Sequence, residues 1–181
     1  MEHNMPEVDD EKIDGIQHKY NETVLFFPSQ GQVCHSYCTF CFRWAQFIGD
    51  NDLKIAAKEA GQLKKYIQAH PEITDVLITG GDPLVMKTKN LRAHIEPLLE
   101  LEQIRTIRIG SKALTFWPYR VVSDADADDL LALFREVQAS GKHLALMAHY
   151  NHWQELETDI AKEAVRRVRA TGAVIRAQGP L

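Results

Sequence analysis

Three cysteines lie close together in this 181-residue chain, at Cys34, Cys38 and Cys41, and the chain contains no others. Their C-x3-C-x2-C spacing places three potential thiolate ligands on one short segment. A [4Fe–4S] cluster is ordinarily held by four cysteine thiolates. Three thiolates would leave one iron with an open coordination position, and metals react at open positions. The spacing therefore indicates a cluster site that takes part in chemistry.

Other uses of the three thiols stay open at this point. A zinc ion would need a fourth ligand, and His35 is the nearest histidine, although adjacent residues rarely both reach one tetrahedral ion. Structural thiols are usually buried singly in apolar surroundings, which does not fit this polar segment. A disulfide with one spare thiol is typical of secreted proteins, and the N-terminus lacks the apolar stretch of a signal peptide. A metal cluster is the favoured interpretation.

Short apolar runs alternate with amphipathic stretches along the chain. The predicted strands are 23–27, 75–79, 106–110, 143–149 and 173–178. The predicted helices are 51–69, 89–100, 125–139 and 158–170. This alternation is typical of right-handed βαβ units and predicts an α/β fold with a parallel sheet.

Details of this layout follow from helix-ending and helix-capping residues. Pro97 is expected to interrupt the helix at 89–100. Ser123 and Asp126 predict a capping box at the start of the helix at 125–139. Residues 1–22 are predicted to be a polar lead-in, and residues 23–181 the folded core.

Composition restricts the partners that the chain can have. The formal net charge is −4, with 45% hydrophobic and 25% charged residues, which is ordinary for a single globular domain. This balance argues against nucleic acid or an anionic membrane as a partner. No apolar run is long enough to cross a bilayer. Reduced thiols without an export signal predict a cytoplasmic protein.

In a parallel α/β fold, ligands gather at the carboxyl ends of the strands. The cysteine segment follows the first predicted strand. The second strand runs into Gly80-Gly81-Asp82-Pro83, where glycines would let the backbone approach a ligand closely. The same residues would also suit an ordinary tight turn.

The cysteine segment, with Phe40 before its last cysteine, resembles the motif of the radical S-adenosylmethionine superfamily. The resemblance implies a partial (β/α) barrel of the TIM type, usually six-stranded, of which about five strands are predicted here. It implies a [4Fe–4S] cluster on Cys34, Cys38 and Cys41 whose open iron binds S-adenosylmethionine, yielding a 5′-deoxyadenosyl radical that abstracts a hydrogen atom. Phe40 would lie near the adenine. The residues Gly80, Gly81 and Asp82 resemble the segment that binds the methionine amino group.

Three further segments are similar to those of the lysine 2,3-aminomutase family. They read G-G-D-P-L at 80–84, R-I-G-S at 108–111 and H-Y-N-H at 149–152. The resemblance implies amino-group migration on an amino acid. It also implies further cofactor-binding residues, which are Arg108, Ser111, His149 and Gln178. Arg43 matches an arginine that the family uses on the substrate carboxylate. Both His149 and Gln178 also fit purely structural roles. His149 could hydrogen-bond a neighbouring carbonyl, and Gln178 could be an ordinary surface amide.

Departures from the family leave the use of pyridoxal phosphate open. The family segment H-R-Y-x-D-R-V-L, whose arginines bind the cofactor phosphate, here begins His18-Lys19-Tyr20 and has Thr23 at the second arginine. Lysine binds phosphate as a point charge, but threonine cannot replace a guanidinium. The family's Schiff-base lysine lies beyond residue 181. Lys112 is the only lysine at a predicted strand end, and the family motif does not place the Schiff base there.

The resemblance also implies a small amino-acid substrate and an electron donor such as flavodoxin or ferredoxin. It leaves open whether the chain forms an oligomer. A strand at 173–178 would have an unpaired edge, so we expect the chain to be part of a longer enzyme. Two alternatives remain. One is a non-catalytic iron–sulfur or zinc-binding domain. The other is a radical S-adenosylmethionine enzyme of another reaction type, without pyridoxal phosphate.

Overall fold

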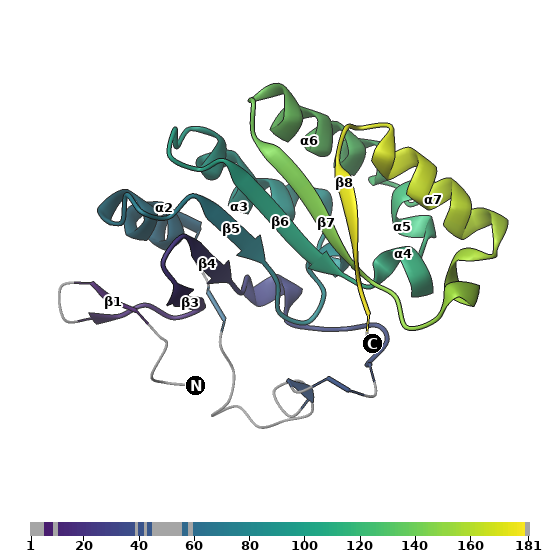
Figure 1. The fold of residues 1–181 in the computed structure, drawn as a ribbon, viewed down its shortest axis with the longest axis horizontal. Helices are drawn as coiled ribbons and strands as arrows, with labels where there is room; N and C mark the ends of the chain where they lie inside the picture. The colour runs from purple at the N-terminus through teal and green to yellow at the C-terminus, as the bar shows by residue number, and fades with distance from the viewer. Residues whose placement is uncertain are drawn as a thin grey trace.

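A computed structural model describes residues 6–8, 11–38, 40–41, 43–44, 56–57 and 60–179. Its main feature is a six-stranded sheet in which the strands follow one another in sequence order (Figure 1). Five neighbouring strands are parallel: β4 (Thr23–Phe26), β5 (Asp75–Ile78), β6 (Thr106–Ser111), β7 (His143–His149) and β8 (Val174–Gln178). Sequential parallel strands are the order of a (β/α) barrel, so the predicted α/β fold and its parallel strands are confirmed.

Helices connect successive strands and cover one face of the sheet (Figure 1). The longer helices are α2 (Ala60–Ala69), α3 (Thr88–Leu99), α6 (Ala127–Ala139) and α7 (Asp159–Arg169). Two short helices between β6 and α6 are α4 (Ala113–Phe116) and α5 (Tyr119–Val122). Short 3-10 turns are η2 (Ser29–Gly31), η4 (Pro83–Val85) and η5 (Trp153–Leu156).

The apolar core lies between the sheet and these helices. Val76 and Ile107 are fully buried and Leu144 nearly so, as alternate residues of their strands. Successive side chains of a strand point to opposite faces, so the intervening residues face the other side of the sheet. Leu25, Leu77 and Met147, for example, line a cavity there. The sheet is therefore fixed through one face while the other remains available for a site.

The predicted polar lead-in over residues 1–22 is corrected by the structure. Part of it forms β3 (Ile16–Tyr20), which pairs antiparallel with β4, and a two-stranded ribbon of β1 (Glu7–Val8) and β2 (Glu11–Lys12). Within β3, Ile16 alone is fully buried. An antiparallel edge strand can be held by backbone pairing and a single buried side chain. Such a strand has little hydrophobic pattern in its sequence, so it was not predicted.

The four predicted helices are present, but several of their details were predicted wrongly. Within the predicted helix 51–69, residues 60–69 form α2, but Ala56 and Ala57 are not helical, and Ala57 pairs with Pro28 in a parallel β-bridge. Residues 51–55 and 58–59 lie outside the described residues. Pro97 does not interrupt α3, which continues to Leu99. Pro97 removes one backbone donor, but the neighbouring Leu98 is fully buried, and this packing holds the last turn in place.

The predicted capping box at the start of α6 is not formed. Asp126 precedes the helix, but its side chain makes no hydrogen bond to the helix N-terminus. Its carboxylate instead accepts hydrogen bonds from the N–H of Thr88 (2.7 Å) and the guanidinium of Arg120 (2.8 Å). A hydrogen bond between two charged groups is stronger than one from a neutral N–H of α6. The carboxylate of Asp126 therefore pairs with the guanidinium of Arg120.

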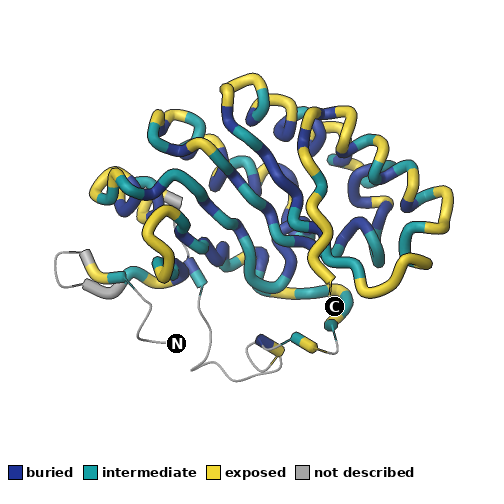
Figure 2. Tube along the Cα trace, viewed as in Figure 1, coloured by how far each residue is buried: buried dark blue, intermediate teal, exposed yellow. Residues whose placement is uncertain are grey.

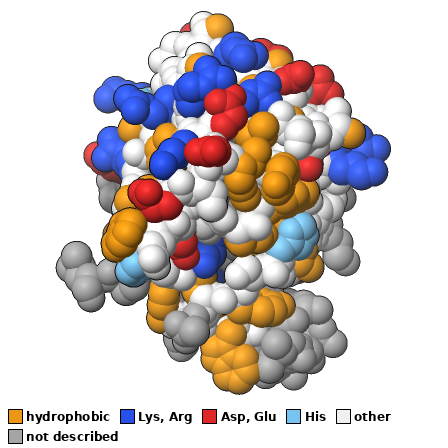
Figure 3. All heavy atoms as spheres, turned by 90° about the vertical axis from the view of Figure 1, so that its right-hand side faces the viewer, with side chains coloured by type: hydrophobic (Ala, Val, Ile, Leu, Met, Phe, Trp, Pro, Cys, Tyr) orange, Lys and Arg blue, Asp and Glu red, His pale blue; other side chains and the backbone are white. Residues whose placement is uncertain are grey.

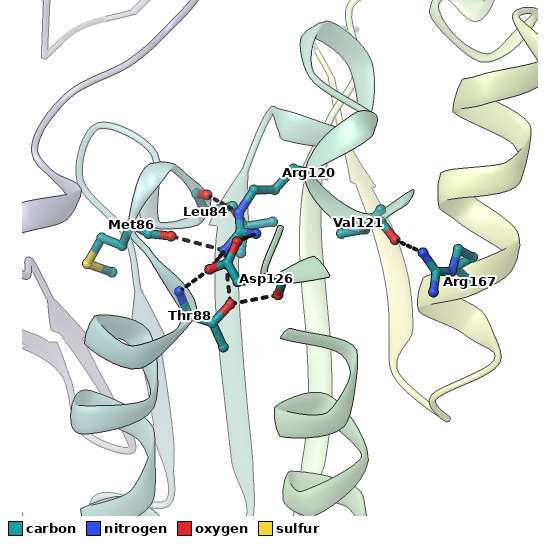
Figure 4. A network of polar contacts seen from close by, with 7 residues as sticks. All are labelled: Leu84, Met86, Thr88, Arg120, Val121, Asp126 and Arg167. Carbon is teal, nitrogen blue, oxygen red and sulfur yellow. Dashed lines mark hydrogen bonds and ion pairs between the residues drawn. The ribbon is translucent and has the colours of Figure 1, made fainter. Parts of the chain in front are cut away.

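Arg120, with 2% of its surface exposed, is the centre of a polar network (Figure 4). Its guanidinium donates to the carbonyls of Leu84 (2.8 Å) and Met86 (3.1 Å) and to the hydroxyl of Thr88 (3.2 Å). Leu84 and Met86 belong to the segment between β5 and α3, Thr88 is the first residue of α3, and Asp126 directly precedes α6. One side chain on α5 therefore fixes the chain as it leaves the carboxyl end of β5.

The outer surface carries mixed charge and one exposed strand. Arg167 on α7 donates to the carbonyl of Val121 (2.9 Å), which joins α7 to α5 (Figure 4). Acidic and basic side chains are interspersed on the face that contains α7 (Figure 3).

β8 is exposed along most of its length, and within the described sheet its strand neighbour is β7 alone (Figure 2). Among the described helices, none has the length and apolar character needed to span a bilayer.

Replacing Arg120 by methionine should destabilise the fold by about 3 kcal/mol, because two buried carbonyls and a carboxylate lose their donor while the side-chain volume is roughly kept. Urea unfolding followed by circular dichroism measures this loss. The matched control is Arg166→Met on α7, where the side chain is 69% exposed and the expected change is below about 0.5 kcal/mol. Equal losses in both variants would contradict the role of the network.

Candidate functional site

The cysteine segment begins by crossing the loop that follows β5. After η2, the N–H of Asp82 donates to the carbonyl of Val33 (2.8 Å), which fixes the chain one residue before Cys34. Further along, the N–H of Cys41 donates to the carbonyl of Cys38 (3.0 Å) and forms a turn between these two cysteines. The segment is thus anchored to the carboxyl end of the neighbouring strand.

This crossing requires residues without side chains at positions 80 and 81. A Cβ atom on Gly81 would lie 2.4 Å from the backbone oxygen of Val33, and one on Gly80 would lie 2.0 Å from the amide nitrogen of Gln32. Gly80 also has a φ of +144°, which other residues rarely adopt. From the sequence, these glycines were expected to admit a ligand. In the structure they also admit the cysteine segment itself.

Asp82 joins the ends of two strands through its buried carboxylate. One carboxylate oxygen accepts from the hydroxyl of Ser111 (2.7 Å) and the N–H of Leu84 (2.9 Å), and the other accepts from the N–H of Lys112 (2.9 Å). Burial raises the pKa of this carboxyl, and these three hydrogen bonds oppose the shift by stabilising the charged form. Asp82 therefore holds the loop after β5 against the end of β6.

A cavity of about 600 Å³ opens at the carboxyl ends of the strands, in the size range of small-molecule sites. The structure brings most of the predicted site residues together around it. Those that line it are Cys34, Cys38, Phe40, Cys41, Arg43, Gly80, Gly81, Asp82, Ser111, His149 and Gln178. Segments that are far apart in the sequence thus contribute to one space.

Arg108 is the predicted residue that the structure does not place with the others. Its Nε donates to the carboxylate of Asp75 (2.8 Å), and its terminal nitrogen lies 3.5 Å from the hydroxyl of Thr23. Both partners begin their strands, so the guanidinium is directed toward the amino ends of the strands, away from the cavity. It is not among the residues that line the cavity.

The three thiols are not grouped as ligands of a single ion. They form no disulfide. The three sulfur atoms are not gathered within 4.8 Å of one another, as they would be about one zinc ion, whose Zn–S bonds of about 2.3 Å hold sulfurs about 3.8 Å apart. In a cubane cluster each thiolate binds a different iron. His35 is exposed and packs near the ring of Trp117 (4.9 Å), rather than joining the thiols.

The electrostatics of the thiols favour them as ligands of a bound cation over free thiolates. Burial, reinforced by the charge of Asp82, raises the pKa of the Cys34 thiol to about 12. Burial also raises the pKa of Cys38. Thiols in such surroundings stay protonated at neutral pH unless a cation offsets the charge, and coordination to a metal provides that cation.

Arg43 is a nearly buried cation in the wall of the cavity, with 8% of its surface exposed. Its guanidinium lies over the ring of Phe27 at 4.2 Å and points one nitrogen toward the amide oxygen of Gln32 (3.4 Å). Burial lowers its pKa to about 10, and the nearby Cys41 and Cys34 oppose that shift. Arg43 thus remains charged at neutral pH and can attract an anionic group in the cavity.

His149 ends β7 and brings a buried, unpaired nitrogen to the cavity. Its ring lies 5.0 Å from the ring of Phe40. Its Nε2 is buried and has no hydrogen-bond partner among the described residues. Burial lowers its pKa, and the charge of Lys112 lowers it further, so the ring is neutral at pH 7. A neutral imidazole in this position can give or accept one hydrogen bond to a bound molecule.

Two lysines that the sequence analysis did not choose also line the cavity. The amine of Lys112 lies 3.6 Å from the carboxylate of Glu155, and 13% of its side chain is exposed. Its position directly after the R-I-G-S segment was a usable signal. Lys19 comes from β3, which was not predicted as a strand. Gln32 and Glu155, which contact Arg43 and Lys112, carried no sequence signal.

The fold and the cavity define a partial (β/α) barrel whose cysteine segment closes over the carboxyl ends of its strands. No protein-family model matches the chain. The chain is 41% identical over 170 residues to a protein of Aquifex aeolicus named "Putative L-lysine 2,3-aminomutase", covering 94% of this chain and 44% of that protein. It is 28% identical over 172 residues to the L-lysine 2,3-aminomutase of Acetoanaerobium sticklandii, covering 95% of this chain and 38% of that enzyme.

By sequence, the chain belongs with the lysine 2,3-aminomutases, as its motifs predicted. It spans less than half the length of these two relatives. Among solved structures, SuiB of Streptococcus suis is 16% identical, with 86% of this chain and 40% of SuiB covered, at a TM-score of 0.41. SuiB bound to S-adenosylmethionine gives a TM-score of 0.39. Similarity at this level supports no conclusion about this chain.

Adding a methyl group at the crossing should displace the cysteine segment. Gly81→Ala should destabilise the fold by about 2 kcal/mol, because the new Cβ would overlap the backbone of Val33. The matched control is Gly61→Ala in α2, where no atom lies within 4 Å of a new Cβ. That change should stabilise the chain by about 0.5–1 kcal/mol, since alanine favours a helix over glycine. Urea unfolding of both variants tests the difference in sign.

Proposed function

We propose that this chain is the core of a radical S-adenosylmethionine enzyme that acts on a small amino-acid substrate, in the manner of the lysine 2,3-aminomutases. The observation that carries the proposal is the convergence of the cysteine segment, the loop at 80–82 and the end of β7 on one cavity. When bound there, a reduced [4Fe–4S] cluster with S-adenosylmethionine supplies a 5′-deoxyadenosyl radical, which removes a hydrogen atom from a substrate.

The residues around the cavity would have distinct roles. Cys34, Cys38 and Cys41 would hold the cluster. Phe40 would pack against the adenine of S-adenosylmethionine, and His149 would give it one hydrogen bond.

The loop after β5 would bind the other end of S-adenosylmethionine. The backbone at Gly80 and Gly81 would face its methionine amino group, while Asp82 and Ser111 fix that loop in place. Gln178, on the exposed β8 at the rim of the cavity, would provide an amide to the same cofactor.

Substrate binding would use the cationic side of the cavity. Arg43 would face the substrate carboxylate, because a guanidinium matches a carboxylate in geometry as well as charge. The apolar side chains of Leu25, Leu77 and Met147 form the base of the cavity and would keep water away from a reactive intermediate.

The proposal extends to the cellular setting. The three thiols must stay reduced to bind iron, and this supports a cytoplasmic location. Cleavage of S-adenosylmethionine needs the cluster to be reduced first, so we propose a small electron carrier, such as flavodoxin or ferredoxin, as a partner.

The decisive experiment is anaerobic reconstitution of the chain with iron and sulfide, followed by reduction and addition of S-adenosylmethionine. We expect 5′-deoxyadenosine, measured by chromatography, and iron analysis near four per chain. Cys38→Ala should reduce 5′-deoxyadenosine to background, because one ligand of the cluster is lost. Ser140→Ala, at the far end of α6, is the control and should leave the yield unchanged.

Two results would contradict the proposal in different ways. A stable cluster without cleavage would favour a non-catalytic iron–sulfur domain. One zinc per chain and no iron would favour the zinc-binding alternative.

A second candidate is a related reaction without pyridoxal phosphate, and Thr23 favours it. This residue replaces an arginine that the family uses on the cofactor phosphate, and its hydroxyl faces Arg108 rather than the cavity. Lys19 is then the remaining cation of that segment at the cavity.

Titration with pyridoxal phosphate, followed by its absorption, separates the two candidates. For the reaction without this cofactor we expect no saturable spectral change in the parent chain and no effect of Lys19→Ala. Saturable binding that weakens at least about tenfold in Lys19→Ala would instead support the aminomutase reaction.

A further inference from the structure

A second group of metal-ligating side chains lies outside the cavity. His18 on β3 and His70 and Glu72 after α2 each offer one ligand atom, and these three atoms lie within 4.8 Å of one another. It is the one such group of three among the described residues. None of the three lines the cavity. The group therefore lies outside the site proposed above.

We propose that His18, His70 and Glu72 bind a divalent first-row transition-metal ion, with Zn²⁺ as the representative ion. Two imidazoles and one carboxylate are a ligand set that such ions use, with a fourth position left for water. Calcium and magnesium prefer sites made wholly of oxygen ligands, so these ions do not fit.

The hydrogen bonds of His18 prepare one ring nitrogen for a metal. Its Nε2 lies 3.1 Å from the backbone carbonyl of Asn21. A carbonyl can only accept, so Nε2 carries the proton and Nδ1 keeps a free electron pair. Nδ1 lies 2.8 Å from the hydroxyl of Tyr66, which can turn its proton elsewhere when an ion binds. A ligating histidine commonly donates its other N–H to a carbonyl in this way.

The spacing of the other two ligands also fits an ion. The Nδ1 of His70 lies 2.9 Å from a carboxylate oxygen of Glu72. Two ligands of a tetrahedral ion, with bonds of about 2.1 Å, lie about 3.4 Å apart, so these two atoms need to separate by only about half an ångström to hold one. The ion would replace the proton that these two atoms share, and the ring of His70 would then carry its proton on Nε2.

The segment that carries His70 and Glu72 is held rigidly. The amide of Gln103 donates to the carbonyls of Ile67 (2.9 Å) and His70 (2.9 Å). The ring of Tyr66 lies 4.2 Å from that of His70 and is tilted by 37°. Ligands on a fixed segment lose little conformational freedom on binding an ion. The ion would join β3, the antiparallel edge strand, to the end of α2.

The test is a titration of the full chain with Co²⁺, because thiolate and imidazole ligands give Co²⁺ different spectra. Cobalt on the cysteines produces intense sulfur-to-metal bands in the near ultraviolet, whereas the proposed site produces weak visible bands alone. We expect one Co²⁺ ion per chain that gives only the weak visible bands of the proposed site. Its affinity should fall at least about tenfold in His70→Ala and in Glu72→Gln. The near-ultraviolet bands should be unchanged in both variants.

Matched controls and a second readout complete the test. Glu100→Gln and His152→Ala change an exposed carboxylate and an exposed histidine elsewhere, and both should bind as the parent does. Zn²⁺ should raise the melting temperature of the Cys34→Ser/Cys38→Ser/Cys41→Ser variant, and adding Glu72→Gln should abolish that rise. Equal binding by Glu72→Gln and the parent, or no visible cobalt bands at micromolar metal, would overturn the proposal.

Discussion

The buried carboxylate of Asp82 is the interaction on which the arrangement of the cavity depends. Its oxygens bind the hydroxyl of Ser111 and the N–H groups of Leu84 and Lys112, and its own N–H binds the carbonyl of Val33. Removing a carboxylate from water is costly unless hydrogen bonds replace the lost solvation, and here three donors do so. These hydrogen bonds fix the positions of the cysteine segment, the loop after β5 and the end of β6 relative to one another. Arg120 supports the same loop from the helix side through the carbonyls at 84 and 86.

The two faces of the sheet have different roles, one in stability and the other in the cavity. One face packs against helices and buries the alternate apolar residues of each strand, which provides the stability. The other face supplies the base of the cavity. Arg43 and Lys112 place positive charge in its walls, close to thiols whose pKa burial raises. The cations suit a bound carboxylate, whereas the raised pKa values of the thiols disfavour thiolates unless a metal cation is bound.

The sequence predicted the parallel strands closely, because each is a short apolar run followed by glycine or a polar turn. β7 has the predicted bounds, and the other four differ by one residue at one end. It missed β3, where Ile16 is the one fully buried residue, and it assigned Asp126 to a cap because nothing local reveals Arg120 as a competing partner. Pro97 was given too much weight, since burial of the neighbouring leucine outweighed one missing hydrogen bond.

For the site, the spacing of the cysteines and the three later segments determined which residues could do chemistry and which family the chain resembles, because these signals are local in the sequence. Tertiary structure decided which of those residues meet. It brought His149 and Gln178 to the cavity, turned Arg108 toward Asp75, and added Lys19 and Lys112. It also gathered His18 with His70 and Glu72, which lie some fifty residues further along the chain. Whether side chains distant in sequence meet depends on strand order, register and the direction of each side chain, and these are fixed only when the core packs.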